Sequence, residues 1–308
     1  MSRDEAELFD WELRERQDED DAAAGYHETY HGFPVARAWD NAFLELVDSE
    51  TVEGDRVLDL GCGPGSLWAH WATLPPLRQL VGVDLSPGMI EEARRRYPDG
   101  DFRVARAHDL PFPDGSFDVV IASAVLHHIP PDHLQGALVE IERVLDEHGK
   151  LIGRDPASGH AFGREPGWFS GAIMSFRHFV YRLTHSREFP EPALGDHHHV
   201  PDSVQLLTSI GSRLTVTTAE TRFPFSNYVQ RVRSDAVAAF ALGLDDRLSD
   251  RTGTMLHYVA EKNFVDEQEL RRVIELAARE VDPKLSDVEF LAYLAAAAQE
   301  LERTFGRR

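Results

Sequence analysis

The sequence predicts an α/β fold built on a doubly wound parallel sheet. Short apolar runs alternate with helical patterns between residues 57 and 154, as expected for βα units joined by right-handed crossovers. The first apolar run, residues 57–60, leads directly into three glycines at alternating positions, Gly61, Gly63 and Gly65. A strand, a glycine loop and a helix in this order are typical of the start of a nucleotide-binding unit.

The individual elements follow from apolar runs and from their boundary residues. Strands are expected at 57–60, 80–84, 102–105, 116–123, 149–154, 213–218 and 255–260. Helices are expected near 34–47, 66–74, 86–97, 132–146, 168–183, 201–210 and 229–244, and two more after residue 265. Ser86 is a suitable N-cap with Pro87 at the first helical position, and capping-box patterns begin at Asp266 and Ser286.

The spacing of the glycines indicates which class of nucleoside ligand the loop binds. Glycines allow a ligand to lie directly on the backbone. The dinucleotide pattern is G-x-G-x-x-G, but here the spacing is G-x-G-x-G and Ser66 stands where the third dinucleotide glycine would fall. This disfavours NAD and favours another nucleoside ligand. Asp84 ends the second expected strand, where a carboxylate can accept hydrogen bonds from both ribose hydroxyls.

Four segments together resemble a known family. Residues 58–65 (LDLGCGPG) and 81–89 (VGVDLSPGM) resemble the first two motifs of class I S-adenosylmethionine-dependent methyltransferases, of the small-molecule type that includes ubiquinone and menaquinone methyltransferases. Residues 107–114 (AHDLPFPD) resemble the adenine-binding stretch of that family, and residues 123–130 its fourth motif. The resemblance covers about residues 25–155. It implies a Rossmann-like, seven-stranded sheet with an antiparallel last strand, and S-adenosyl-L-methionine as the cofactor.

The resemblance also implies which residues bind the cofactor. Asp59 and Gly61 are expected to hold the methionine end, and Asp84 the ribose. Leu85 and Ala107 are expected to border the adenine. The full predicted cofactor site consists of Asp59, Gly61, Cys62, Gly63, Gly65, Asp84, Leu85, Met89, Arg106, Ala107 and Ser123.

One position departs from the family pattern. The residue before the alanine is usually an acid that accepts a hydrogen bond from the adenine amino group, but here it is Arg106. A guanidinium group cannot accept a hydrogen bond. Either Asp109 or a backbone carbonyl therefore takes the place of the acid, or the affinity for the cofactor is reduced.

A general base is needed if the methyl acceptor is a hydroxyl or an acidic carbon. The candidates, in order, are His128, His127, Tyr26 and Tyr30. The two histidines follow the fourth expected strand, at the edge where ligands bind in open α/β sheets; alternatively, they cap the turn into the next helix. The two tyrosines would share one face of a helix over the site, or pack inside the protein.

Composition limits the partners and the compartment. The 308 residues include 53 acids and 32 bases, of which three are lysines, giving a net charge of -21. The excess of acids disfavours nucleic acid as a partner. It favours adaptation to a salt-rich cytoplasm, with an ordinary acidic protein as the alternative.

The single cysteine, Cys62, rules out a disulfide within the monomer and favours a reducing, cytoplasmic compartment. No apolar run reaches the roughly 20 residues of a membrane span, so stable membrane insertion is not expected.

The expected domain organisation has three parts. Residues 1–24 form an acidic segment that contains Phe9, Trp11 and Leu13 and is either disordered or a short helix docked by its aromatic residues. Residues 25–264 form the methyltransferase domain, with a helical cap inserted at about 160–200 and a second insertion at about 226–252. Residues 265–308 form a helical extension. The alanine-rich face at 295–298 suits packing against another helix, either of this chain or of a second subunit. A homodimer is therefore one of the two hypotheses.

The composition of the expected cap indicates which kind of methyl acceptor the protein binds. Residues 168–183 are rich in large apolar groups, which suits a cap over an apolar or aromatic acceptor; a packing helix and peripheral membrane contact are the alternatives. The histidine run 197–199 is not expected to bind a metal, because adjacent histidines do not easily reach one ion.

The sequence therefore predicts a methyltransferase for a small-molecule acceptor. A non-enzymatic module with the same fold is the second hypothesis, and a nucleotide-dependent oxidoreductase is the third. Arg106 supports the non-enzymatic module. The glycine spacing disfavours the oxidoreductase.

Overall fold

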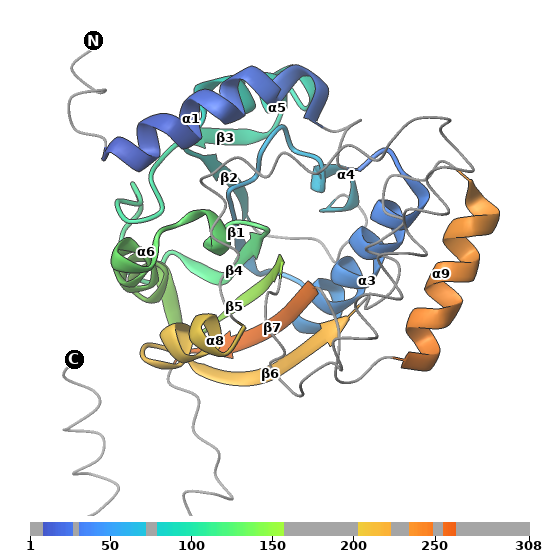
Figure 1. Cartoon of the computed structure of the whole chain (residues 1–308). Coiled ribbons are helices and arrows are strands. Elements are labelled where there is room, and N and C mark those ends of the chain that lie inside the picture. The colour runs from blue at the N-terminus through green and yellow to red at the C-terminus, as the bar shows by residue number, and fades with distance from the viewer. Residues whose placement is uncertain are drawn as a thin grey trace, which may run out of the picture. The chain divides into compact units, whose positions relative to one another are not determined.

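The computed structural model describes residues 9–26, 31–71, 79–156, 203–222, 234–248 and 255–262 (Figure 1). The chain divides after Asn263 into two units, and every described residue belongs to the first. Tyr30, the expected cap at 160–200, the histidine run and the expected C-terminal extension lie outside the described residues. Within the described part, no helix combines the length and the apolar composition needed to cross a membrane.

Seven strands form one sheet in the order β3-β2-β1-β4-β5-β7-β6. Their bounds are Arg56–Leu60 (β1), Gln79–Asp84 (β2), Asp101–Val104 (β3), Phe117–Ser123 (β4), Leu145–Pro156 (β5), Thr215–Arg222 (β6) and Met255–Glu261 (β7). Strands β1 to β5 pair in parallel, and β7 is antiparallel to both β5 and β6. The predicted doubly wound sheet and its antiparallel last strand are confirmed.

The helices of the described part cover both faces of this sheet. Their bounds are Asp10–Ala22 (α1), Pro34–Glu50 (α3), Trp68–Trp71 (α4), Pro87–Arg96 (α5), Pro131–Val144 (α6), Ser203–Gly211 (α8) and Asp235–Leu248 (α9), with short 3₁₀ turns η2 at Ala23–Gly25 and η3 at Leu126–His128. The expected helix at 132–146 ends earlier, because β5 begins at Leu145 rather than at 149.

The core explains why the central strands are almost continuously apolar. Figure 1 shows α3 on one side of the sheet and α6 on the other. Val119 and Ile121 of β4 pack with α3, whereas Val120 and Ala122 pack with α6. Both faces of the strand are therefore buried, and alternation of polar and apolar residues is absent, as expected for parallel sheets covered by helices.

Within the N-terminal segment, residues 10–22 form a docked helix rather than a disordered chain. Helix α1 lies along α5 at the β3 edge of the sheet (Figure 1). Trp11 packs against the main core, as one alternative predicted. The helix also buries a carboxylate, Glu12, which is only 1% exposed. A buried acid requires a partner, and Arg106 provides it.

Candidate functional site

The glycine loop has the backbone conformation that its sequence indicates. Gly61, Gly63 and Gly65 have φ values of 67°, 53° and 71°, in the left-handed region where side chains are disfavoured. At Gly61 a Cβ would also lie 2.3 Å from Cγ2 of Val125. At Gly63 a Cβ would meet nothing within 4 Å. The backbone of the loop at Gly63 therefore borders open space.

Asp84 links the loop to the second strand. Its Oδ2 accepts a hydrogen bond from the Gly63 backbone N–H at 2.9 Å, and its Oδ1 accepts one from the Ser86 N–H, also at 2.9 Å. Burial raises the pKa of Asp84 to about 6, against the opposing effect of the two N–H groups. The carboxylate is thus fixed in direction at the end of β2.

A cavity lies at the carboxyl ends of β1, β2 and β4, bordered by Leu60, Val83 and Ser123. This is the topological switch point of the sheet, because the chain runs from β1 outward to β3 and then returns to β4 on the other side. Ligands of open α/β sheets bind at such a point. The facing wall is helix α1, which contributes Trp11, Glu12, Glu15, Arg16 and Glu19.

The predicted site residues divide into two groups. The residues that line the cavity are Gly61, Gly63, Asp84, Leu85, Ala107 and Ser123 of the cofactor set, and Tyr26 and His128 of the candidate bases. The described residues that do not line it are Asp59, Cys62, Gly65, Met89, Arg106 and His127. Of this second group, all but Arg106 are buried.

His127 and His128 lie in different surroundings. Nδ1 of His127 lies 2.9 Å from Oδ1 of Asp155, which also accepts a hydrogen bond from the His127 backbone N–H at 3.1 Å. The Tyr258 hydroxyl donates to the other oxygen of Asp155 at 2.9 Å. All three side chains are buried. His127 therefore fastens the turn after β4 to β5 and β7, which is the turn-capping alternative.

His128 faces the cavity and contacts α1. Its Nδ1 lies 2.7 Å from Oε1 of Glu15. Burial opposes protonation of the ring, but the nearby carboxylates of Glu15, Glu19 and Asp155 outweigh it and hold the pKa of His128 above its ordinary value. His128 is thus oriented by an acid that precedes it by more than one hundred positions.

Ser123 is held by a buried chain of charged groups. Its Oγ accepts a hydrogen bond from Nε of Arg154 at 2.8 Å, and Nη2 of Arg154 donates to Asp40 at 2.6 Å. The second oxygen of Asp40 lies 2.7 Å from Nδ1 of His31. Burial would raise the pKa of Asp40, but His31 and Arg154 outweigh it and lower that pKa. This network fixes the end of β4 against α3, and no local pattern in the sequence predicted it.

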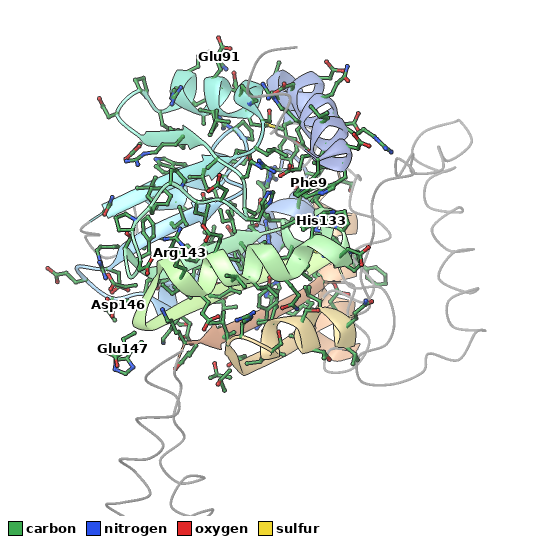
Figure 2. The ribbon with its side chains drawn as sticks, turned by 90° about the vertical axis from the view of Figure 1, so that its left-hand side faces the viewer. Phe9, Glu91, His133, Arg143, Asp146 and Glu147 are labelled. Carbon is green, nitrogen blue, oxygen red and sulfur yellow. The ribbon has the colours of Figure 1, made fainter. Side chains whose placement is uncertain are left out.

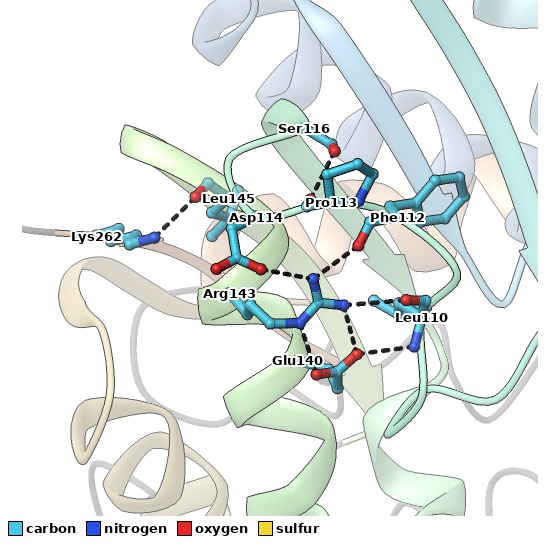
Figure 3. Close-up of polar contacts among 9 residues, drawn as sticks. All are labelled: Leu110, Phe112, Pro113, Asp114, Ser116, Glu140, Arg143, Leu145 and Lys262. Atoms are coloured by element: carbon cyan, nitrogen blue, oxygen red, sulfur yellow. Dashed lines mark hydrogen bonds and ion pairs between the residues drawn. The ribbon is translucent and has the colours of Figure 1, made fainter. Parts of the chain in front are cut away.

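The segment that resembles the adenine-binding stretch is fastened to α6. Arg143 donates to the backbone carbonyls of Phe112 at 2.7 Å and Leu110 at 3.0 Å, and Glu140 accepts from the Leu110 N–H at 2.8 Å (Figure 3). Arg143 also bonds Glu140 directly. The backbone beside the cavity is therefore held by two side chains of one helix turn.

Within the described residues, no three His, Cys, Asp or Glu side chains gather as ligands of a metal ion would.

Comparison with known proteins identifies the part of the chain that carries this site. Residues 58–153 match the family model described as a methyltransferase domain. This range contains the glycine loop, Asp84, Ala107, Ser123 and His128. This segment is similar in sequence to a methyltransferase domain. The family resemblance of the sequence is confirmed for this segment.

Curated relatives are similar to this chain over 103 to 124 residues. A malonyl-[acyl-carrier protein] O-methyltransferase of Legionella pneumophila is 39% identical over 103 residues, which are 32% of this chain and 34% of that protein. A demethylmenaquinone methyltransferase of Beutenbergia cavernae is 38% identical over 116 residues, 38% of this chain and 46% of that protein. An aklanonic acid methyltransferase of a Streptomyces species is 38% identical over 124 residues, 36% and 53% of the two chains. The chain thus spans a third to about half of these relatives.

A solved structure supports the fold over a longer stretch. A methyltransferase-fold chain in a complex of the Haloferax volcanii Trm112 activator with a methyltransferase has a TM-score of 0.52 and 18% identity, covering 80% of this chain and 98% of that chain. At this identity the similarity concerns the fold alone.

Helix α1, which precedes the matched segment, carries an acid whose titration affects stability. Burial raises the pKa of Glu19 from 4.5 to about 7; Asp84 and Glu15 add to this effect, and His128 opposes it. Since the folded state binds this proton more tightly than the unfolded state, the stabilisation is present below about 4.5 and is lost as the pH rises through about 7. Glu19→Gln is therefore expected to raise the free energy of unfolding at pH 8 by about 1–2 kcal/mol and to leave it nearly unchanged at pH 4.5.

Urea unfolding at both pH values, at one fixed potassium chloride concentration, measures this difference. Glu91→Gln on the exposed side of α5 is the matched control (Figure 2) and should show no such dependence on pH. An equal effect of Glu19→Gln at both pH values would contradict the assignment.

Proposed function

We propose that this chain is an S-adenosylmethionine-dependent methyltransferase that acts on a small molecule. The observation that carries the proposal is the arrangement of Asp84 and Gly63 at the cavity. A carboxylate fixed at the end of β2 borders the same cavity as a glycine backbone that has open space before it. This arrangement lies within the matched methyltransferase domain.

The lining residues fit the chemical groups of the cofactor. Asp84 can accept hydrogen bonds from ribose hydroxyls, and the small side chains of Ala105 and Ala107 leave room for a flat base. Acidic side chains (Glu12, Glu15, Glu19 and Asp84) outnumber basic ones (Arg16 and His128) along the cavity, which favours a positively charged ligand. When bound, the cofactor supplies a methyl group on a positively charged sulfur atom. The protein then mainly positions the acceptor and excludes water.

His128 is the best-placed base of the three candidates that the structure describes. It lines the cavity and is oriented by Glu15, whereas Tyr26 lines the cavity beside His31. For an acceptor that must lose a proton, His128→Asn is expected to lower kcat by about 100-fold and to change the cofactor Kd by less than about threefold. Because the ring must be neutral to accept a proton, kcat should rise with pH through the raised pKa of His128.

Single-turnover rates and calorimetric Kd values separate the two effects. An acceptor that is methylated on a carboxylate needs no base, so an unchanged kcat in the variant would assign the acceptor to that class and remove His128 as a base.

The first experiment is calorimetric titration with S-adenosylmethionine and S-adenosylhomocysteine in molar potassium chloride. The salt screens the self-repulsion that follows from a net charge of -21. Micromolar binding of either ligand is expected. Binding of neither ligand to folded protein would refute the proposal, and titration with NAD would then test the oxidoreductase alternative.

The acceptor class is proposed from the sequence and from the relatives. The apolar segment 168–183 favours an apolar or aromatic acceptor, and the names of two relatives concern demethylmenaquinone and aklanonic acid. A screen with labelled cofactor should therefore contain a demethylated naphthoquinol, an aromatic polyketide acid and, because of the third relative, a malonyl thioester. We expect methylation of one of the two aromatic compounds.

A further inference from the structure

The arginine that departs from the family pattern has a buried partner on α1. Nε of Arg106 donates to Oε1 of Glu12 at 3.1 Å, and Nη2 donates to Oε2 at 2.9 Å. The side chain of Glu12 is 1% exposed, that of Arg106 21%. The two-point geometry is the strong form of a carboxylate–guanidinium pair. A carboxylate this deeply buried requires such a partner, because an unpaired charge there would be strongly destabilising.

The same turn of α1 makes further contacts with the segment after β3. Nδ1 of His108 lies 3.4 Å from Oε1 of Glu12, and the Arg106 guanidinium lies 5.4 Å from the centre of the Phe9 ring. Phe9 also packs against His133 of α6, with ring centres 4.4 Å apart (Figure 2). The start of α1 is thus fixed against the segment that resembles the adenine-binding stretch.

The other end of α1 is fixed to the segment after β2. Oδ1 of Asp20 accepts hydrogen bonds from the Ser86 hydroxyl at 2.5 Å and from the Gly88 backbone N–H at 2.8 Å. A Cβ at Gly88 would lie 2.9 Å from the same carboxylate oxygen, so the close approach requires glycine. Both ends of α1 are therefore attached to segments that border the cavity.

Next to Glu12, Trp11 carries an unused donor. The indole lines the cavity, and its Nε1 is buried without a hydrogen-bond acceptor among the described residues. Indole N–H is a donor and not an acceptor. A buried donor is costly unless it is satisfied, and the ring nitrogens of adenine are acceptors. Trp11 therefore has the chemistry to recognise an adenine ring from the side opposite the sheet.

We propose that α1 replaces the missing acid as the adenine-recognition element, with Trp11 as the specificity residue and the Glu12–Arg106 pair as the positioning residues that hold it. The inference rests on the proposed function, since it concerns the site of the same cofactor. Arg106 is then an attachment point for a recognition helix rather than a defect in the adenine site.

A double-mutant cycle tests the positioning pair. Glu12→Gln and Arg106→Gln are each expected to weaken binding of S-adenosylhomocysteine at least tenfold by calorimetry. The double variant should lose no more than either single variant, because all three release the same helix. Asp101→Asn is the matched control: it removes one member of the exposed Asp101–Arg103 pair on β3 and should leave Kd unchanged.

Trp11→Phe tests the recognition step separately. It keeps an aromatic ring but removes the donor, and should weaken binding about fivefold, as expected for one hydrogen bond. Circular dichroism should show a folded protein for every variant.

The outcomes separate the two proposals. Wild-type binding with unchanged Kd in the Trp11 and Glu12 variants would overturn this inference and leave the proposed function intact. Additive losses in the cycle would overturn the role of the pair. If the wild-type chain binds neither cofactor nor product, the proposed function fails and the inference fails with it.

Discussion

Asp84→Ala is expected to abolish binding of S-adenosylmethionine and S-adenosylhomocysteine. Two charge-assisted hydrogen bonds to ribose are lost, each contributing about 1.5–3 kcal/mol, so Kd should rise by at least about 100-fold. The variant also removes the acceptor for the backbone N–H groups of Gly63 and Ser86. The glycine loop should therefore lose its fixed position as well.

Calorimetry with the two ligands measures this loss, and Asp84→Asn separates its two causes. The amide can still accept from the loop but carries no charge, so we expect it to bind more weakly than wild type and more tightly than Asp84→Ala. Asp99→Ala, in the exposed turn before β3, is the control and should bind normally. An unchanged Kd in Asp84→Ala would exclude Asp84 from the cofactor site.

Gly153→Ala is expected to destabilise the protein by about 3 kcal/mol or more, because it overpacks a core that is already full. A Cβ at this position in β5 would lie 2.1 Å from Cζ of Tyr258 on β7. Tyr258 is fully buried and its hydroxyl is bonded to Asp155, so the ring cannot move without breaking that bond.

Gly243→Ala is the matched control for this substitution. Gly243 lies in helix α9, and a Cβ there would meet nothing within 4 Å. The same chemical change should stabilise the protein by roughly 0.5–1 kcal/mol, because alanine is the better helix former. Urea unfolding of both variants at equal salt provides the comparison. Effects of the same sign would show that packing against Tyr258 does not require glycine at position 153.

The fold was predictable because its signals are local. Strands such as β1 and β4 are buried on both faces, so they are short, continuous apolar runs between polar or glycine-rich segments. The glycine loop was predictable for a related reason, since positive φ values restrict the residue type at Gly61, Gly63 and Gly65 themselves. Asp84 followed from its place at the end of an apolar run.

The two histidines are an example of what local sequence patterns do not predict. His127 and His128 are neighbours of the same residue type, so the sequence ranked both as candidate bases. Turn η3 directs His127 to Asp155 and His128 to the cavity and Glu15. Each partner lies far away in the sequence, and no periodicity encodes the choice between them.

The sequence by itself therefore predicted the strands, the glycine loop and the residues proposed to bind the cofactor. Each strand and the glycine loop depend on residues that are close together in the chain. The tertiary structure alone showed that α1 forms one wall of the site and that Arg106 pairs with Glu12, 94 positions away. Opposite charges are abundant in this chain, with 53 acids and 32 bases. Composition cannot select one pair among so many, and only the packing of α1 against the sheet buries Glu12 where it needs Arg106.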